Sequence, residues 1–238
     1  MFILFHLVSG LVVGYLLADR LRNMTLILPC VFGALLPDLV DKPLGLLILS
    51  ESVGSGRIFL HTLLFLLVLL ITGWALLSRY RAPALFAVAI GVASHQVLDL
   101  MWEMPKTWFY PFLGQFEPIS QEGWFLHELL LELRNPVEWI SALLLGLVLL
   151  PLLSSRVAGW MNSTLQPILR PATLLAVPLL AAAGLFILFY GVTNHYTPLT
   201  GWSAGYNIVG GFTILLAGYA AYRFYRTIPD GETSIGLK

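Results

Sequence analysis

Long apolar runs bounded by charged residues constrain this chain more than any other feature of its sequence. The runs 58–77, 172–192 and 206–225 each hold about 20 residues, the length at which a helix rising 1.5 Å per residue crosses a hydrocarbon core about 30 Å thick. Only 11% of the 238 residues are charged and 58% are apolar. A soluble domain carries about 25% charged residues. The sequence therefore predicts an all-α integral membrane protein.

Four shorter apolar runs raise the expected number of transmembrane helices to seven, with five as the fallback. The runs 2–18 and 84–101 each contain a histidine, and the runs 24–37 and 139–153 are shorter still. A short run can cross a bilayer that thins locally around it or can extend into its flanking residues. We expect one membrane domain over the whole chain.

Basic residues predict the orientation of these helices, because cytoplasmic loops are enriched in Lys and Arg. With the N-terminus outside, nine basic residues fall on the inner side, namely Arg20, Arg22, Arg79, Arg81, Arg156, Arg170, Arg223, Arg226 and Lys238. Only four fall on the outer side, namely Lys42, Arg57, Lys106 and Arg134. The sequence therefore predicts an extracytoplasmic N-terminus and a cytoplasmic C-terminus.

One long connection, residues 102–138, is rich in aromatic residues and prolines. Trp and Tyr favour the headgroup level of a bilayer, so we expect an extracytoplasmic aromatic loop there. It separates a first half, residues 1–112, from C-terminal helices within 139–238. His127, Glu128 and Glu132 in this loop could add ligands for a further ion, and a solvated interfacial helix explains them equally well.

Charge balance and cysteine content exclude several functions. The 13 Lys and Arg residues equal the 13 Asp and Glu residues, so there is no basic field to attract nucleic acid. A single cysteine, Cys30, excludes an internal disulfide and a multi-cysteine metal site. Any chemistry is expected to depend on His and carboxylate side chains.

Ionisable side chains from four predicted helices are expected at one depth near the outer surface. Arg57 and His61 are four residues apart at the start of one helix, and His95 and Asp99 are four apart near the end of another, with Glu103 a further turn along. The converging groups are His6, Asp38, Asp41, Arg57, His61, His95 and Asp99.

Buried polar groups in a membrane are costly unless they are paired or coordinated, so this convergence favours a divalent cation such as zinc, which binds imidazole nitrogen and carboxylate oxygen. Taken singly, each residue has a structural explanation: packing for His6, capping or a turn for Asp38 and Asp41, snorkelling for Arg57. Those explanations give no reason for a common location. We therefore predict metal binding by Asp38, His61, His95 and Asp99.

At these residues the sequence resembles the YdjM-type membrane-bound metal-dependent hydrolases of bacteria and archaea. The matching elements are His6, residues 33–41 (GALLPDLVD), Gly56-Arg57 followed by His61-Thr62, and residues 94–99 (SHQVLD), with Tyr110-Pro111-Phe112 as an aromatic-proline end. The ligand pattern is also similar to that of zinc-dependent phospholipase C and the related single-strand nucleases. This resemblance implies that Asp38, His61, His95 and Asp99 surround one zinc ion. It also implies that His6 and Asp99 help to hold a second ion, with one to three ions in all.

The resemblance implies a hydrolase of the prokaryotic inner membrane with its active site facing outside. We expect it to cleave a phosphoester of a membrane lipid or lipid-linked substrate, as a phospholipase C-like phosphodiesterase or a phosphatase. Asp38 and Asp41 would act on the attacking water, or Asp41 would hold a ligand histidine, and Arg57 would contact a phosphate oxygen. The alternatives are a metal or ion transporter and a structural membrane protein whose metal is not catalytic. A transporter usually places polar residues near the midplane of the bilayer.

Overall fold

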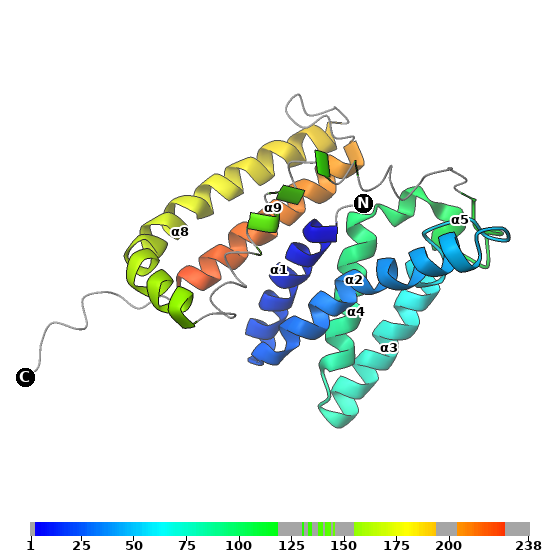
Figure 1. The fold of residues 1–238 in the computed structure, drawn as a ribbon, viewed down its shortest axis with the longest axis horizontal. Helices are drawn as coiled ribbons and strands as arrows, with labels where there is room; N and C mark the ends of the chain where they lie inside the picture. The colour runs from blue at the N-terminus through cyan, green and yellow to red at the C-terminus, as the bar shows by residue number, and fades with distance from the viewer. Residues whose placement is uncertain are drawn as a thin grey trace, which may run out of the picture. The chain divides into compact units, whose positions relative to one another are not determined.

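The computed structural model describes residues 3–118, 155–193 and 204–226, together with positions 130, 133–134, 138–139, 141–143 and 145. The chain divides into two compact units, residues 1–146 and 147–238, and each is described by itself (Figure 1). Every regular element in the described part of the chain is helical. The prediction of an all-α membrane protein is confirmed.

Five helical segments among the described residues are long and apolar enough to cross a membrane. They are Ile3–Leu21, Met24–Ile48, Leu63–Tyr80, Pro171–Val192 and Ala204–Tyr225, and the apolar helix Ala84–Leu98 is shorter. The run 139–153 lies largely outside the described residues. The count of seven spans and their orientation therefore stay predictions.

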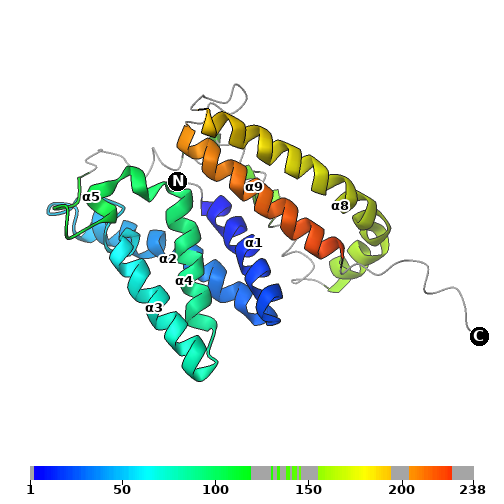
Figure 2. The same cartoon turned by 180° about the vertical axis from the view of Figure 1, so that it is seen from behind.

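Among the described residues of the first unit, four long helices and the short helix α5 are joined by short helical turns and loops. In chain order the elements are α1 (Ile3–Leu21), η1 (Met24–Leu26), α2 (Ile27–Pro43), η2 (Leu44–Ile48), η3 (Phe59–His61), α3 (Leu63–Tyr80), α4 (Ala84–Leu98), η4 (Met101–Glu103) and α5 (Pro105–Trp108). Helix α2 packs against α1 and α4, and α4 also packs against α1 and α3 (Figures 1 and 2). Helix α2 is therefore contacted by α1, α4 and the turn η3.

Glycines bring α2 and α4 into backbone contact. A Cβ atom on Gly33 of α2 would lie 2.1 Å from the carbonyl oxygen of Val88, and a Cβ atom on Gly91 of α4 would lie 2.1 Å from that of Cys30. No other residue fits at either position without moving the helices apart. Because His95 is one turn beyond Gly91, this close approach turns the His95 ring toward the backbone of α2.

Two of the predicted helix ends that differ in the structure lie beside His61 and Asp99. The third helix begins at Leu63 rather than Ile58, because the Thr62 side chain caps it by accepting a hydrogen bond from the backbone N–H of Phe65. The fourth helix ends at Leu98, because Leu100 adopts a left-handed conformation with φ 52°. Exposed Glu103 therefore does not extend the row of His95 and Asp99.

The second helix is longer than predicted. It continues beyond Pro37 through Pro43, so Asp38 and Asp41 lie within its last turns. A proline removes one backbone hydrogen bond, and helices packed inside a membrane protein tolerate that loss. Both carboxylates therefore lie on one helix, beyond the predicted end of the run at Pro37.

In the second unit, α8 (Ser155–Val192) and α9 (Ala204–Tyr225) pack side by side (Figures 1 and 2). A Cβ atom on Gly184 would lie 3.0 Å from the carbonyl oxygen of Gly211, so the backbones nearly touch at this point. Helix α9 begins two residues before the predicted run 206–225 and ends with it. Helix α8 extends well beyond the predicted run 172–192.

Candidate metal centre

Four buried side chains bring one ligand atom each to a common point. They are Asp38 of α2, His61 of η3, His95 of α4, and Asp99, which follows the last residue of α4; their ligand atoms all lie within 4.8 Å of one another. Both histidines are fully buried, and both aspartates are 8% exposed. We call these four residues the ligand cluster. This set could hold a metal ion.

The separations within the ligand cluster suit tetrahedral coordination. The Nε2 atom of His61 lies 3.7 Å from Oδ1 of Asp38 and 3.8 Å from Oδ2 of Asp99, and Nε2 of His95 lies 3.9 Å from each of the same oxygens. Ligand bonds of about 2.1 Å in tetrahedral geometry separate neighbouring ligand atoms by about 3.4 Å. The two Nε2 atoms are 3.2 Å apart and no two ligand atoms are more than 4.8 Å apart, so small side-chain shifts would reach that geometry.

The hydrogen bonds made by the Nδ1 atoms of His61 and His95 set the tautomers of these two rings. Nδ1 of His95 lies 2.7 Å from the carbonyl oxygen of Ala34, which can only accept, so Nδ1 carries the proton and donates it. Nδ1 of His61 donates to the carboxylate of Asp41 over 2.7 Å. In the neutral rings both Nε2 atoms therefore present lone pairs to the cluster. This is the arrangement that metal-ligating histidines adopt.

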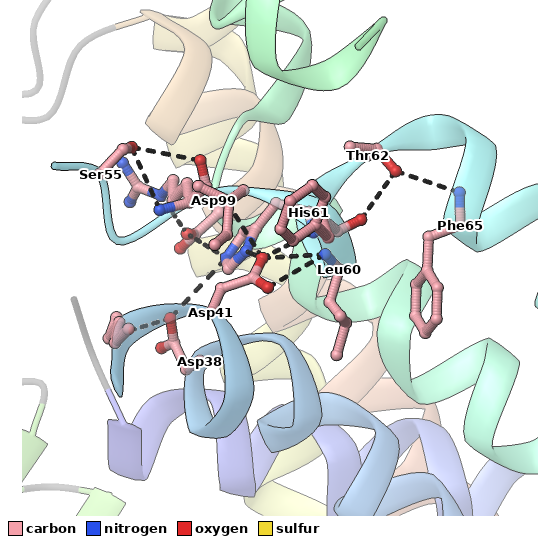
Figure 3. Close-up of polar contacts among 12 residues, drawn as sticks. Asp38, Asp41, Ser55, Leu60, His61, Thr62, Phe65 and Asp99 are labelled. Carbon is pink, nitrogen blue, oxygen red and sulfur yellow. Dashed lines mark hydrogen bonds and ion pairs between the residues drawn. The ribbon is translucent and has the colours of Figure 1, made fainter. Parts of the chain in front are cut away.

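Asp41 organises the connection that carries His61. Its carboxylate accepts hydrogen bonds from the backbone N–H groups of Ile58, Leu60 and His61 as well as from the His61 ring (Figure 3). Asp41 is fully buried. A buried carboxylate bonded to this many donors holds the loop rather than facing a substrate. Of the two predicted roles for Asp41, the geometry supports holding His61.

Gln96 braces the same connection from α4. Its Nε2 atom donates to the carbonyl oxygens of Leu60 and Thr62, on either side of His61, at 3.1 Å each. Its Oε1 atom accepts from Nε1 of Trp108 at 3.0 Å. Gln96 thereby ties His61 to the start of the aromatic segment. Gln96 was not among the predicted site residues, although an amide next to His95 in an otherwise apolar run is a signal for one.

Each carboxylate of the ligand cluster has its own cation. Arg57 donates from Nε to Oδ2 of Asp99 at 2.7 Å, and Lys42 lies with Nζ 2.5 Å from Oδ1 of Asp38. Arg57 was expected near the site, and the structure places it there, although the spacing argument for it was wrong. Arg57 lies in a bend rather than on a helix shared with His61. Lys42 was not predicted.

His6 lies beside the ligand cluster and outside the set of converging ligand atoms. Its ring stacks on that of His95 with centroids 4.2 Å apart, and its Nε2 atom lies 3.2 Å from Oδ1 of Asp99. Its Nδ1 atom is buried without a hydrogen-bond partner among the described residues. His6 contacts Oδ1 of Asp99, whereas Oδ2 of the same carboxylate is the oxygen that lies 3.8 and 3.9 Å from the Nε2 atoms of His61 and His95.

Glu138 fixes the start of the helix that carries His6. The backbone N–H groups of Leu4 and Phe5 donate to its two carboxylate oxygens at 3.0 and 3.1 Å. A carboxylate at a helix N-terminus satisfies donors that have no partner within the helix. His127, Glu128 and Glu132, which were considered as further ligands, lie outside the described residues.

The fold and the ligand cluster define a class: a helical membrane protein with a buried histidine and aspartate site that could bind a metal ion. A family model supports this assignment. The YdjM inner membrane protein family matches residues 1–165, which include every residue of the ligand cluster, and the chain belongs to this family. No curated protein and no solved structure matches the chain. The family and the apolar helices indicate an inner-membrane location.

Proposed function

We propose that the chain is a metal-dependent hydrolase that cleaves a phosphoester of a membrane lipid or lipid-linked substrate at the extracytoplasmic face. The observation that carries this proposal is the convergence of Asp38, His61, His95 and Asp99, with both rings oriented through their second nitrogens. Two imidazoles and two carboxylates suit zinc, and other divalent metal ions can use the same ligands. A bound ion would supply Lewis-acid polarisation of a phosphoryl oxygen and activation of water.

The protein's own groups have distinct parts in this proposal. Asp38 has a second carboxylate oxygen that can orient the attacking water or accept its proton. Arg57 can donate a charge-assisted hydrogen bond to a phosphoryl oxygen beside Asp99. Asp41 acts through His61 and is a positioning residue. His6 holds Asp99, and with that carboxylate it can contribute to a second ion.

The depth of the site supports a lipid substrate. His95 lies in the last turn of α4, Asp99 follows that helix, and Asp38 lies in the last two turns of α2; the aromatic residues that begin at Trp102 follow Asp99 in the chain. Aromatic residues favour the headgroup level, where a lipid presents its phosphate. A substrate could therefore reach the site without leaving the bilayer.

A structural metal site is the second candidate, because four protein atoms can fill a tetrahedral shell and leave no position for substrate. Turnover separates the two functions. The protein is purified in detergent, its metal is measured by elemental analysis, and hydrolysis is assayed on a lipid extract and on synthetic phosphoesters. His95→Ala and Asp99→Ala should lose both metal and hydrolysis, whereas exposed Glu103→Ala should keep both. Hydrolysis by metal-stripped His95→Ala would refute the hydrolase proposal, and stoichiometric metal without hydrolysis would favour the structural role.

A further inference from the structure

Lys42 is a buried cation in direct contact with the ligand cluster. It lies in the last turn of α2, four residues after Asp38, and its side chain is 12% exposed. Its Nζ atom approaches Oδ1 of Asp38, the oxygen that also faces His61 and His95. Beyond this ion pair, Nζ has no hydrogen-bond partner in the described part of the chain.

The stem of Lys42 is held against the backbone of the loop that leads to His61. A Cβ atom added to Gly56 would lie 3.3 Å from Cγ of Lys42. The glycine therefore leaves room for the lysine stem, and the packing directs the ammonium group inward. Burying an ammonium group at membrane depth costs several kcal/mol unless it is compensated. A lysine in this position needs an anionic partner both when the site is empty and when it holds a metal ion.

The balance of charges around the site indicates which group pairs with the Lys42 ammonium when a metal ion is present. With neutral histidines, the carboxylates of Asp38, Asp41 and Asp99 exceed the cations Lys42 and Arg57 by one negative charge. A divalent ion would turn this into one excess positive charge. Lys42 and the ion would then share Asp38 and repel each other in a poorly solvated place. A bound anion would remove both the excess charge and the unused donors of the ammonium group.

We propose that Lys42 is a substrate-contacting residue that donates to a non-bridging oxygen of a phosphate group bound at the metal centre. This inference rests on the proposed function and names the group that selects an anionic substrate. Arg57 is placed differently, since its Nε atom donates to Asp99, the other carboxylate of the ligand cluster. The two cations would therefore contact different oxygens of one phosphate.

The test measures phosphate binding without turnover. Purified protein in neutral detergent is loaded with Co²⁺, and its visible absorption is followed while inorganic phosphate is added. A second arm replaces phosphate with phosphatidic acid in mixed micelles, against phosphatidylcholine micelles as a blank. The variants are Lys42→Met, Lys42→Gln and Lys42→Arg. The matched control is Lys106→Met, which removes an exposed lysine paired with exposed Glu117.

Removal of a charge-assisted hydrogen bond should weaken phosphate binding by about 10-fold to 100-fold in Lys42→Met and Lys42→Gln. Both variants should bind Co²⁺ at least as tightly as the wild type, because the competing ammonium group is gone. Lys42→Arg should recover most of the phosphate affinity, and Lys106→Met should behave as the wild type. A Lys42-dependent response in either arm supports the inference, and the arm that responds identifies a free or a lipid-borne phosphate.

Unchanged phosphate binding in both neutral variants would overturn the inference, as would loss of Co²⁺ from both, since Lys42 would then be a structural counter-ion. The proposed function is tested separately by phosphoester turnover of the wild type. Lys42-dependent phosphate binding in a protein without turnover would leave the inference standing and refute the hydrolase. Turnover by the wild type together with phosphate binding that does not depend on Lys42 would support the hydrolase and refute the inference.

Discussion

His61 and His95 bring their Nε2 atoms to 3.2 Å from each other while the Nδ1 atom of each ring is bonded elsewhere. Two neutral rings held in this way direct two lone pairs at one point inside the protein. Such a contact is repulsive unless a positive centre lies between the nitrogens. The pairing therefore favours binding of a cation between the two nitrogens. Such a cation would account for two buried imidazoles lying side by side in an apolar bundle.

Zinc should stabilise the folded protein through this pair. At a free zinc concentration one hundred times the Kd, binding to the folded state alone contributes about 2.7 kcal/mol. Thermal unfolding in detergent, followed with and without a chelator, should therefore show a higher Tm with zinc for the wild type and no zinc-dependent shift for His95→Ala. A full zinc-dependent shift in His95→Ala would contradict the ligand assignment.

Asp41→Asn should weaken metal binding although Asp41 is not among the converging ligand atoms. The amide loses one acceptor oxygen and the negative charge that holds Nδ1–H of His61 and three backbone N–H groups. Loss of such an outer contact typically lowers metal affinity about 10-fold to 100-fold. Competition with a zinc-responsive dye measures the affinity. Glu51→Gln, at an exposed carboxylate, is the matched control and should leave it unchanged.

How far the sequence predicts this site depends on whether a helix persists between the residues compared. Asp38 and Asp41 are three residues apart on one helix, so their spacing corresponds to neighbouring positions on its surface. The prediction from spacing that Arg57 and His61 share one helix face was wrong. The loop that holds them is organised by the carboxylate of Asp41 and does not form a continuous helix. Contacts between elements were not predictable. The bond from His95 to the Ala34 carbonyl depends on how closely two glycine-containing helices approach, and no residue pattern gives that distance.

Gln96→Leu should lower metal affinity, because Gln96 holds the backbone on both sides of His61. The leucine keeps the volume and removes all three hydrogen bonds. Trp108→Phe removes only the indole donor to Gln96 and should have a smaller effect in the same direction. The dye competition assay measures both variants. An affinity for Trp108→Phe below that for Gln96→Leu would show that Trp108 acts other than through Gln96.

Gly91→Ala should separate α2 from α4 and disturb the metal centre from one turn away. The added Cβ atom would lie 2.1 Å from the Cys30 carbonyl oxygen, so the helices must move apart and stretch the bond from His95 to Ala34. Overpacking of this kind costs about 1 to 3 kcal/mol. We expect a lower Tm together with weaker zinc binding. Val97→Ala on the same helix, at a side chain 47% exposed, should change neither. A lower Tm with wild-type zinc affinity would show that the helix contact does not position His95.

The proposed orientation, with the metal centre facing outside the cell, can be tested by cysteine labelling, because Cys30 is the single cysteine in the sequence. Cys30 is fully buried, so the wild type should react little with a membrane-impermeant maleimide. Glu103→Cys introduces an exposed thiol just beyond the metal centre, and Arg79→Cys introduces one in the last turn of α3, at the other end of the α3 and α4 pair. With the site facing outside, Glu103→Cys should label in intact spheroplasts. Arg79→Cys should label only in inverted vesicles. The opposite pattern would place the ligand cluster on the cytoplasmic side and exclude an outer-leaflet lipid as the substrate.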